Sequence, residues 1–171
     1  MIRSLDGIAP KIHPTAFVSE AAYVIGDVVI GEGSSVWPGS VIRGDMGRIT
    51  IGKYTCVQDN SVVHCDTDAN IGDYVVIGHR VVCHAKNVGT RSLLGNGSVV
   101  NDGVWIGDEC VIASGAVVLD DMQVPERSIV VGVPGRIRGE VQDRHLELGD
   151  YFSGVYVLKT QRYLRNGGLS S

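Results

Sequence analysis

The stretch that decides the fold is VVHCDTDANIGDYVVIGHRVVCH, residues 62–84. Within it, Ile71, Ile77 and Cys83 are spaced six residues apart, and the β-branched Val75 stands four residues after the first of them. A period of six fits neither an α-helix, with about 3.6 residues per turn, nor a hairpin meander, with a turn signal every ~8–12 residues. It is typical of a parallel β-helix, in which each hexad forms one short strand and one turn.

The same period extends through most of the chain, with changes of register after residues 42, 63 and 83. The positions that keep it are Ile12, Val18, Val24, Ile30, Val36, Ile42, Ile51, Val57, Val63, Ile71, Ile77, Cys83, Val88, Leu94, Val100, Ile106, Ile112, Val118, Val124 and Val130. Three hexads close one triangular coil around inward-pointing side chains, so these twenty positions predict about seven coils. Consecutive coils stack at the ~4.8 Å strand spacing. The sequence therefore predicts an all-β parallel β-helix over residues 1–138.

The hexad pattern ends before the C-terminal part of the chain. The segment 140–165 has helical composition, and we expect interruptions near Gly149 and Gly154. The apolar side of this helix is expected to carry Tyr156, Tyr163 and Leu164. We therefore predict a second unit, residues 139–171, formed by a helix that packs along the prism and frays from Gly167 onward.

Composition excludes several classes of function. Among 171 residues, 15 Lys and Arg stand against 19 Asp and Glu, giving a net charge of −4 without a basic cluster, which disfavours nucleic-acid binding. Apolar runs fall short of the ~18–20 residues that a membrane span needs, and the start lacks a secretory signal. No CxxC pair is present, so we expect a cytoplasmic protein with reduced thiols at Cys56, Cys65, Cys83 and Cys110.

Two histidines occupy equivalent places on consecutive coils. His64 follows Val63 and His84 follows Cys83, and these inward positions are three hexads apart. The two imidazoles are therefore expected on the outside of the prism, with their backbones about one strand spacing, ~5 Å, apart. That separation lets both bind one metal ion with bonds of ~2.0–2.1 Å.

A third histidine belongs to another part of the coil. His79 lies two residues after Ile77, and its neighbour on the preceding coil is Asp59. Because His79 does not reach the other two within its own chain, we expect a cyclic homotrimer in which a neighbouring copy completes the site. Three neutral nitrogen ligands leave zinc one position for water, which is the catalytic arrangement.

Three motifs resemble the γ-class carbonic anhydrases, which are left-handed β-helix trimers with a helix along the prism. They are RGD (43–45), VQDNSVVH (57–64) and IGHRVVCH (77–84). The resemblance covers essentially the whole chain and implies metal-dependent, reversible hydration of carbon dioxide to bicarbonate. It also implies that His64, His79 and His84 bind the metal, with His79 coming from the adjacent subunit, and that the metal is zinc, with iron or cobalt as alternatives.

The resemblance implies roles for five further residues. Arg43 and Asp45 are expected to form an ion pair between subunits. Gln58 is expected to hydrogen-bond the metal-bound water or bicarbonate, and Asp59 to orient neighbouring groups. Tyr156 matches a tyrosine of the family's C-terminal helix and is expected to lean into the pocket.

The sequence departs from the family at three places. The loop after RGD (46–50) contains no carboxylate, where the best-known member has a proton-shuttle glutamate. His84 is followed by Ala85 instead of the usual glycine, and Asn101 stands where a large apolar residue is common.

Two other functions remain open at this point. The segments 102–118 and 128–138 are similar to those of hexapeptide acyltransferases that use acetyl-CoA, in which His79 or His84 would act as the general base. A general base needs one histidine, whereas a metal site needs three. The third interpretation is a trimeric protein that binds metal for structure, without hydratase activity.

Overall fold

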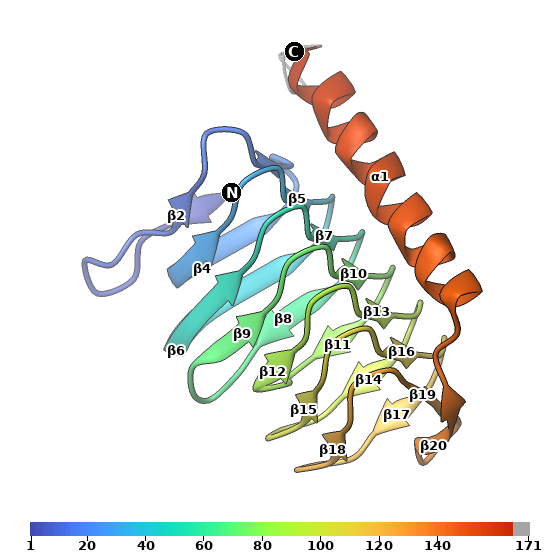
Figure 1. Ribbon diagram of the computed structural model, residues 1–171. Coiled ribbons are helices and arrows are strands. Elements are labelled where there is room, and N and C mark those ends of the chain that lie inside the picture. The colour runs from blue at the N-terminus through green and yellow to red at the C-terminus, as the bar shows by residue number, and fades with distance from the viewer. Residues whose placement is uncertain (166–171) are drawn as a thin grey trace.

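The computed structural model describes residues 1–165 as a stack of triangular coils with one helix lying along its side (Figure 1). The fraying expected from Gly167 onward lies outside the described residues. The strands are β1 (Ile2–Arg3), β2 (Lys11–Ile12), β3 (Phe17–Val18), β4 (Tyr23–Ile30), β5 (Ser35–Val36), β6 (Val41–Ile51), β7 (Cys56–Val57), β8 (Val62–His64), β9 (Ala69–Ile71), β10 (Val76–Ile77), β11 (Val82–Cys83), β12 (Asn87–Val88), β13 (Leu93–Leu94), β14 (Val99–Val100), β15 (Trp105–Ile106), β16 (Val111–Ile112), β17 (Val117–Val118), β18 (Gln123–Val124), β19 (Ser128–Val131) and β20 (Arg136–Glu140).

The strands fall on three faces of the prism. The helix face contains β3, β5, β7, β10, β13, β16 and β19, and it is covered by α1 (Asp143–Arg165). The valine face contains β8, β11, β14, β17 and the start of β6, and the polar face contains the end of β6 with β9, β12, β15 and β18. Pairing along each face is parallel until β20, which runs antiparallel to β19. This is the parallel β-helix of about seven turns that the hexad spacing predicts, in the left-handed form that the resemblance implies.

The hexad positions form the core, as predicted. All twenty lie in one cluster, and all but Ile12 and Val18 are buried. A fully buried side chain of this kind contributes about 1.5–3 kcal/mol, so the aliphatic column is the main source of stability. The four cysteines are free and buried.

Small hydroxyl residues join one coil to the next at the corners. The Oγ atoms of Ser34 and Ser61 donate to the carbonyl oxygens of Gly52 and Gly78, each at 2.6 Å. Each hydroxyl also accepts a backbone N–H from the following coil, as from Val81 to Ser61 at 3.0 Å. These buried polar side chains are thus satisfied by the backbone, which explains why serine is tolerated inside the prism.

The C-terminal helix is continuous, so the interruptions predicted near Gly149 and Gly154 are wrong. Each glycine costs a helix about 1 kcal/mol relative to alanine. Packing offsets that cost, because the Tyr156 ring lies 5.2 Å from the buried Trp37 and Asp150 forms an ion pair with Arg91 at 2.8 Å. Among the described residues, this helix is not long and apolar enough to cross a membrane.

Candidate metal centre

Strands β8 and β11 place His64 and His84 side by side. Val82 and Cys83 pair in register with Val62 and Val63, so the residue that follows each pair leaves the sheet at the same edge. His64 Nδ1 lies 2.7 Å from His84 Nε2, and the His64 side chain is only 5% exposed. The structure therefore shows the two histidines facing each other at one point, as the hexad register predicts.

The other nitrogen of each imidazole is held by a carboxylate. His64 Nε2 lies 2.8 Å from Asp45 Oδ1, and His84 Nδ1 is bonded to Asp102. Carboxylates in this position fix the tautomer and the ring orientation of metal-binding histidines. The nitrogens that face each other are thus the ones left available to a ligand.

Arg43 completes this edge of the prism, which we call the metal edge (Arg43, Asp45, His64, Asp66, His84 and Asp102). Within one chain Arg43 forms its ion pair with its own Asp45, whereas the resemblance implied a pair between subunits. Burial alone would raise the pKa of Asp45, but hydrogen bonds with Arg43 and His64 outweigh it and lower the pKa. Asp45 is therefore an ionised acceptor for His64.

His79 lies at a different edge, which we call the His79 edge (Asp59 and His79). It precedes β11, whereas His84 directly follows that strand. Its Nδ1 lies 3.1 Å from Asp59 Oδ2, and its Nε2 lies 3.5 Å from the hydroxyl of Tyr156. At 43% exposure its side chain is much more open than that of His64. Asp59 thus contacts the imidazole that it is expected to orient.

Gln58 and Tyr156 line a cavity of about 450 Å³ beside His79, between α1 and the helix face. Gln58 is buried and donates through Nε2 to Cys56 Sγ at 3.7 Å. Burial, followed by the nearby Cys56 and Asp59, raises the pKa of Tyr156 to about 12. Its hydroxyl is therefore protonated at neutral pH and is available as a donor.

The structure thus sorts the predicted site residues into two groups. Arg43, Asp45, His64 and His84 meet at the metal edge. Gln58, Asp59, His79 and Tyr156 meet around the other edge and the cavity next to it. The contacts of the described residues bring His79 to Asp59 and Tyr156, and not to the other two histidines.

Sequence reasoning missed two carboxylates of the metal edge. Asp102 holds His84, and Asp66 Oδ1 lies 4.0 Å from His64 Nδ1. The ligand atoms of His64, Asp66 and His84 all lie within 4.8 Å of one another. The hexad register could have indicated both carboxylates. Asp66 is two residues after His64, and Asp102 follows Asn101, which is stacked on His84.

The donor set of the metal edge fits a divalent transition metal. Two imidazole nitrogens, each backed by a carboxylate, suit zinc, iron or cobalt. Two ligand nitrogens on a tetrahedral zinc lie about 3.3 Å apart, given bonds of ~2.0–2.1 Å. The observed 2.7 Å between His64 Nδ1 and His84 Nε2 is close to that value, so a small rotation of either ring admits an ion.

Between the two edges lies a ladder of outward-pointing valines. Val41, Val62, Val82, Val99 and Val117 pair in register on consecutive coils. Val82 is 39% exposed, and the described chain supplies a covering helix only for the helix face. An exposed apolar column of this kind is typical of a surface that binds another protein.

Comparison with known proteins places the chain among hexapeptide-repeat proteins. Residues 9–44 and 86–120 match the bacterial transferase hexapeptide (six repeats) family. The carnitine operon protein CaiE of Escherichia coli (strain K12) is 36% identical over 145 residues, covering 84% of this chain and 74% of that protein. The mitochondrial gamma carbonic anhydrase 1 of Arabidopsis thaliana is 37% identical over 146 residues, covering 81% of this chain and 53% of that protein.

A solved structure agrees over nearly the full length. The crystal structure of a hexapeptide transferase family protein from Anaplasma phagocytophilum has a TM-score of 0.91 at 30% identity. The alignment covers 95% of this chain and 98% of that one.

Proposed function

Since the chain belongs to the hexapeptide-repeat family, whose members similar to it include a gamma carbonic anhydrase, we propose that it is a metal-dependent carbonic anhydrase-like protein. It hydrates carbon dioxide reversibly to bicarbonate at sites shared between the subunits of a homotrimer. One observation carries the proposal. Each of the three histidines has one ring nitrogen held by a carboxylate, with Asp45 on His64, Asp102 on His84 and Asp59 on His79.

The histidine contacts support the ligand assignment. A metal-binding histidine almost always donates its other ring N–H to a carboxylate, a backbone carbonyl or water, and here each of the three rings has its own carboxylate. His64 and His84 provide two ligands from one chain, and His79 of a neighbouring copy provides the third. A zinc, iron or cobalt ion bound by these residues would supply a Lewis acid that lowers the pKa of water, to about 7 in the case of zinc.

The remaining residues have roles that follow from their contacts. Asp45, itself held by Arg43, keeps His64 in the tautomer that leaves Nδ1 free. Gln58 and the protonated hydroxyl of Tyr156 provide donors in the cavity beside His79, where they bind and orient carbon dioxide or bicarbonate. Asp59 fixes the ring of His79.

The valine face supports the trimeric arrangement. It separates the His79 edge from the metal edge, so packing the faces of three copies around one axis brings each His79 toward the His64–His84 pair of a neighbour. The apolar ladder supplies the hydrophobic contact that such an interface needs.

A mixing experiment tests the shared site. His84→Ala and His79→Ala proteins are each expected to lose the metal and the hydration activity. When equal amounts are unfolded and refolded together, about a quarter of the interfaces should combine the intact His64–His84 pair with an intact His79. Metal content and carbon dioxide hydration should recover to that fraction. No recovery would contradict a site shared between subunits, and metal recovery without hydration would leave a metal-binding trimer of another function.

One observation favours a second candidate, an acyl-CoA-dependent acyltransferase. The cavity beside His79 has a volume of about 450 Å³, which exceeds what carbon dioxide requires, and Leu93, Phe152 and Val155 give it apolar walls. His79 would then act as the general base, oriented by Asp59. Calorimetric titration with acetyl-CoA and an acyl-transfer assay separate the two functions. Acetyl-CoA binding that is unaffected by metal removal, together with acyl transfer that is lost in His79→Ala, supports the transferase.

A further inference from the structure

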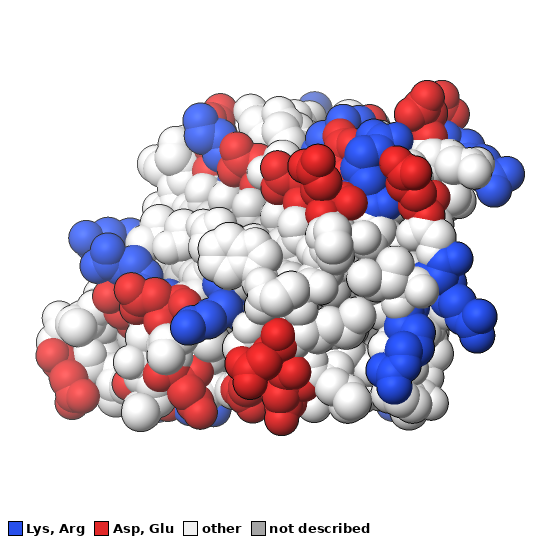
Figure 2. Space-filling model, turned by 60° about the horizontal axis from the view of Figure 1, so that its bottom comes forward, with Lys and Arg blue, Asp and Glu red and all other residues white. Residues whose placement is uncertain are grey.

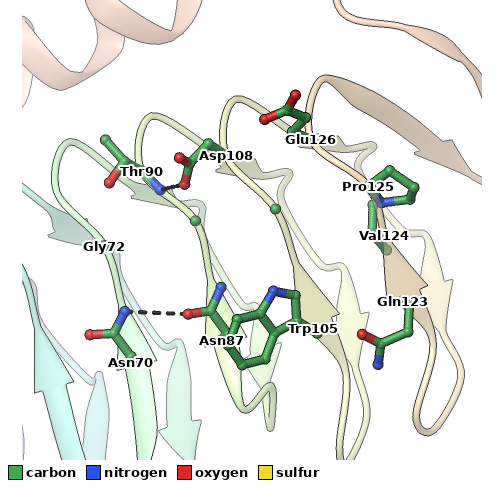
Figure 3. Close-up of a pocket in the computed structure, with 12 residues that line it drawn as sticks. Asn70, Gly72, Asn87, Thr90, Trp105, Asp108, Gln123, Val124, Pro125 and Glu126 are labelled. Carbon is green, nitrogen blue, oxygen red and sulfur yellow. Dashed lines mark hydrogen bonds between the residues drawn. The ribbon is translucent and has the colours of Figure 1, made fainter.

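The polar face has neither the helix nor the valine ladder of the other two faces. Its outward positions on consecutive coils are Asn70, Asn87, Trp105 and Gln123, which pair in register. Figure 3 shows the Trp105 ring beside Asn87, with Asn70 donating to Asn87 at 3.3 Å. The face is therefore lined by amides around one aromatic ring.

A trough runs next to this row, and its floor is formed by the glycines that follow the row, Gly72, Gly89 and Gly107. These glycines allow close stacking of the coils, since a Cβ atom at Gly89 would lie 2.3 Å from the backbone of Gly107. Trp105 separates two adjoining hollows of about 520 and 570 Å³, the first of which contains the glycines. Hollows of this size hold a ligand of several rings.

The side chains of the trough offer both donors and acceptors. Each amide carries an NH₂ and a carbonyl oxygen, and their contacts with one another leave part of that capacity unused. The Trp105 side chain is 51% exposed, and the described part of the chain offers its indole N–H no acceptor. A flat apolar ring surrounded by mixed donors and acceptors matches a molecule with C–H faces and hydroxyl groups at its rim.

Charge restricts the ligand further. The first hollow is lined by Asp108 and Glu126, and among its described lining residues there is no lysine or arginine. The second has Arg48 and Lys86 beside Asp68 and Asp121, so the ligand is assigned to the first hollow. Figure 2 shows both acidic and basic side chains around an uncharged central area. Carboxylates repel phosphates and nucleic acids, while a purely donating cation would leave the amide NH₂ groups without acceptors.

We propose that this trough binds a neutral carbohydrate, with one sugar ring stacked on Trp105 and its hydroxyl groups bonded to Asn87, Gln123 and Glu126. The proposal is independent of the metal site, because the trough residues Asn87, Trp105 and Gln123 lie on the polar face.

Tryptophan fluorescence gives a direct test. The protein has two tryptophans, and Trp37 is buried, so quenching by iodide reports on Trp105. Maltotriose, cellotriose and chitotriose serve as neutral probes, argininamide as the cationic probe and uridine monophosphate as the anionic one. At least one trisaccharide should protect Trp105 from iodide, and the two charged probes should not. Calorimetry should then show about a tenfold loss of affinity in Trp105→Ala, and a smaller loss in Trp105→Tyr.

Three results would overturn the proposal: no trisaccharide protects Trp105, argininamide or uridine monophosphate protects it better, or Trp105→Ala binds as well as the original protein. The circular dichroism spectrum and metal content of Trp105→Ala serve as controls. Both should be unchanged, because the ring is half exposed and lies outside the metal edge.

Discussion

The two edges of the valine face are built differently. At the metal edge, two histidines stack on consecutive coils, bury one ring almost completely and are held by carboxylates of their own chain. At the other edge, a single half-exposed histidine faces Asp59 and the helix residue Tyr156. In the proposed site, the first edge supplies two ligands and the second edge of a neighbouring copy supplies the third.

The hexad spacing also differs between the two edges. The three changes of register, after residues 42, 63 and 83, all lie at the corner that forms the metal edge. The first leaves room for β6 to pass around the corner and carry Arg43 and Asp45, and the second inserts the segment that contains Asp66. At the His79 edge the period is regular. The changes in the hexad spacing therefore mark the corner of the prism that carries the residues of the metal edge.

The largest effect is expected from a charge in the surface between the edges. Val82→Asp places a carboxylate in the centre of the valine ladder, and burying it without a partner costs several kcal/mol, about 3–5 by analogy with broken buried pairs. Light scattering should then show monomers, and elemental analysis should show loss of the metal. Gln123→Asp on the polar face is the matched control and should remain trimeric. A trimeric Val82→Asp protein would contradict the assignment of this face.

The next largest effect is the loss of a single ligand from either edge. His84→Ala and His79→Ala should each reduce the metal content from about one ion per chain to near zero, because two imidazoles hold zinc far more weakly than three. Both variants should stay trimeric, since neither residue belongs to the valine ladder. If His79→Ala retains its metal, then the third ligand lies elsewhere and the comparison between the edges is wrong.

A smaller effect is expected from the carboxylates that hold the rings. Asp102→Asn and Asp59→Asn keep the size of the side chain but remove the charge, and such changes typically weaken metal binding by about 10–100-fold. Competition with a chelator measures the affinity of each variant. Equal losses of metal affinity in the two variants would show that both edges supply carboxylate-held histidine ligands to the metal. No loss in either would contradict the orienting role of both residues.

The smallest effect is expected from Asp66, which is the alternative third ligand within one chain. Its side chain is 69% exposed, so Asp66→Asn should change the metal affinity by no more than about twofold. The same chelator competition measures it. A complete loss of metal here, together with retention in His79→Ala, would place the entire site within a single chain.

The sequence predicted the fold well because one rule governs it. The period of six fixes which side chains point inward, and all the positions that keep this period lie in the core cluster. The same rule predicted that His64 and His84 would be adjacent, since the residue after an inward position leaves the same corner on every coil. It also separated His79 from them.

Features that the period does not govern were missed or wrong. The contact of Asp102 with His84 depends on the side-chain conformation of a residue at the corner of the coil, which the hexad period does not specify. The predicted breaks at Gly149 and Gly154 relied on intrinsic helix propensity, whereas packing of Tyr156 on Trp37 keeps the helix continuous. Trp105 and the trough beside it depend on which residues point outward, and the hexad period does not specify these.

The reversal at β20 has a consequence for assembly. The last coil of a parallel stack exposes unpaired backbone N–H and C=O groups, to which a further coil can be added. β20 covers β19 in the opposite direction, and so blocks the helix face against addition of another coil. At the other end of the stack, β1 and β2 pair parallel with β4, so they continue the ladder there. The reversed strand therefore covers one face at one end of the stack, where it opposes the end-to-end addition of another chain.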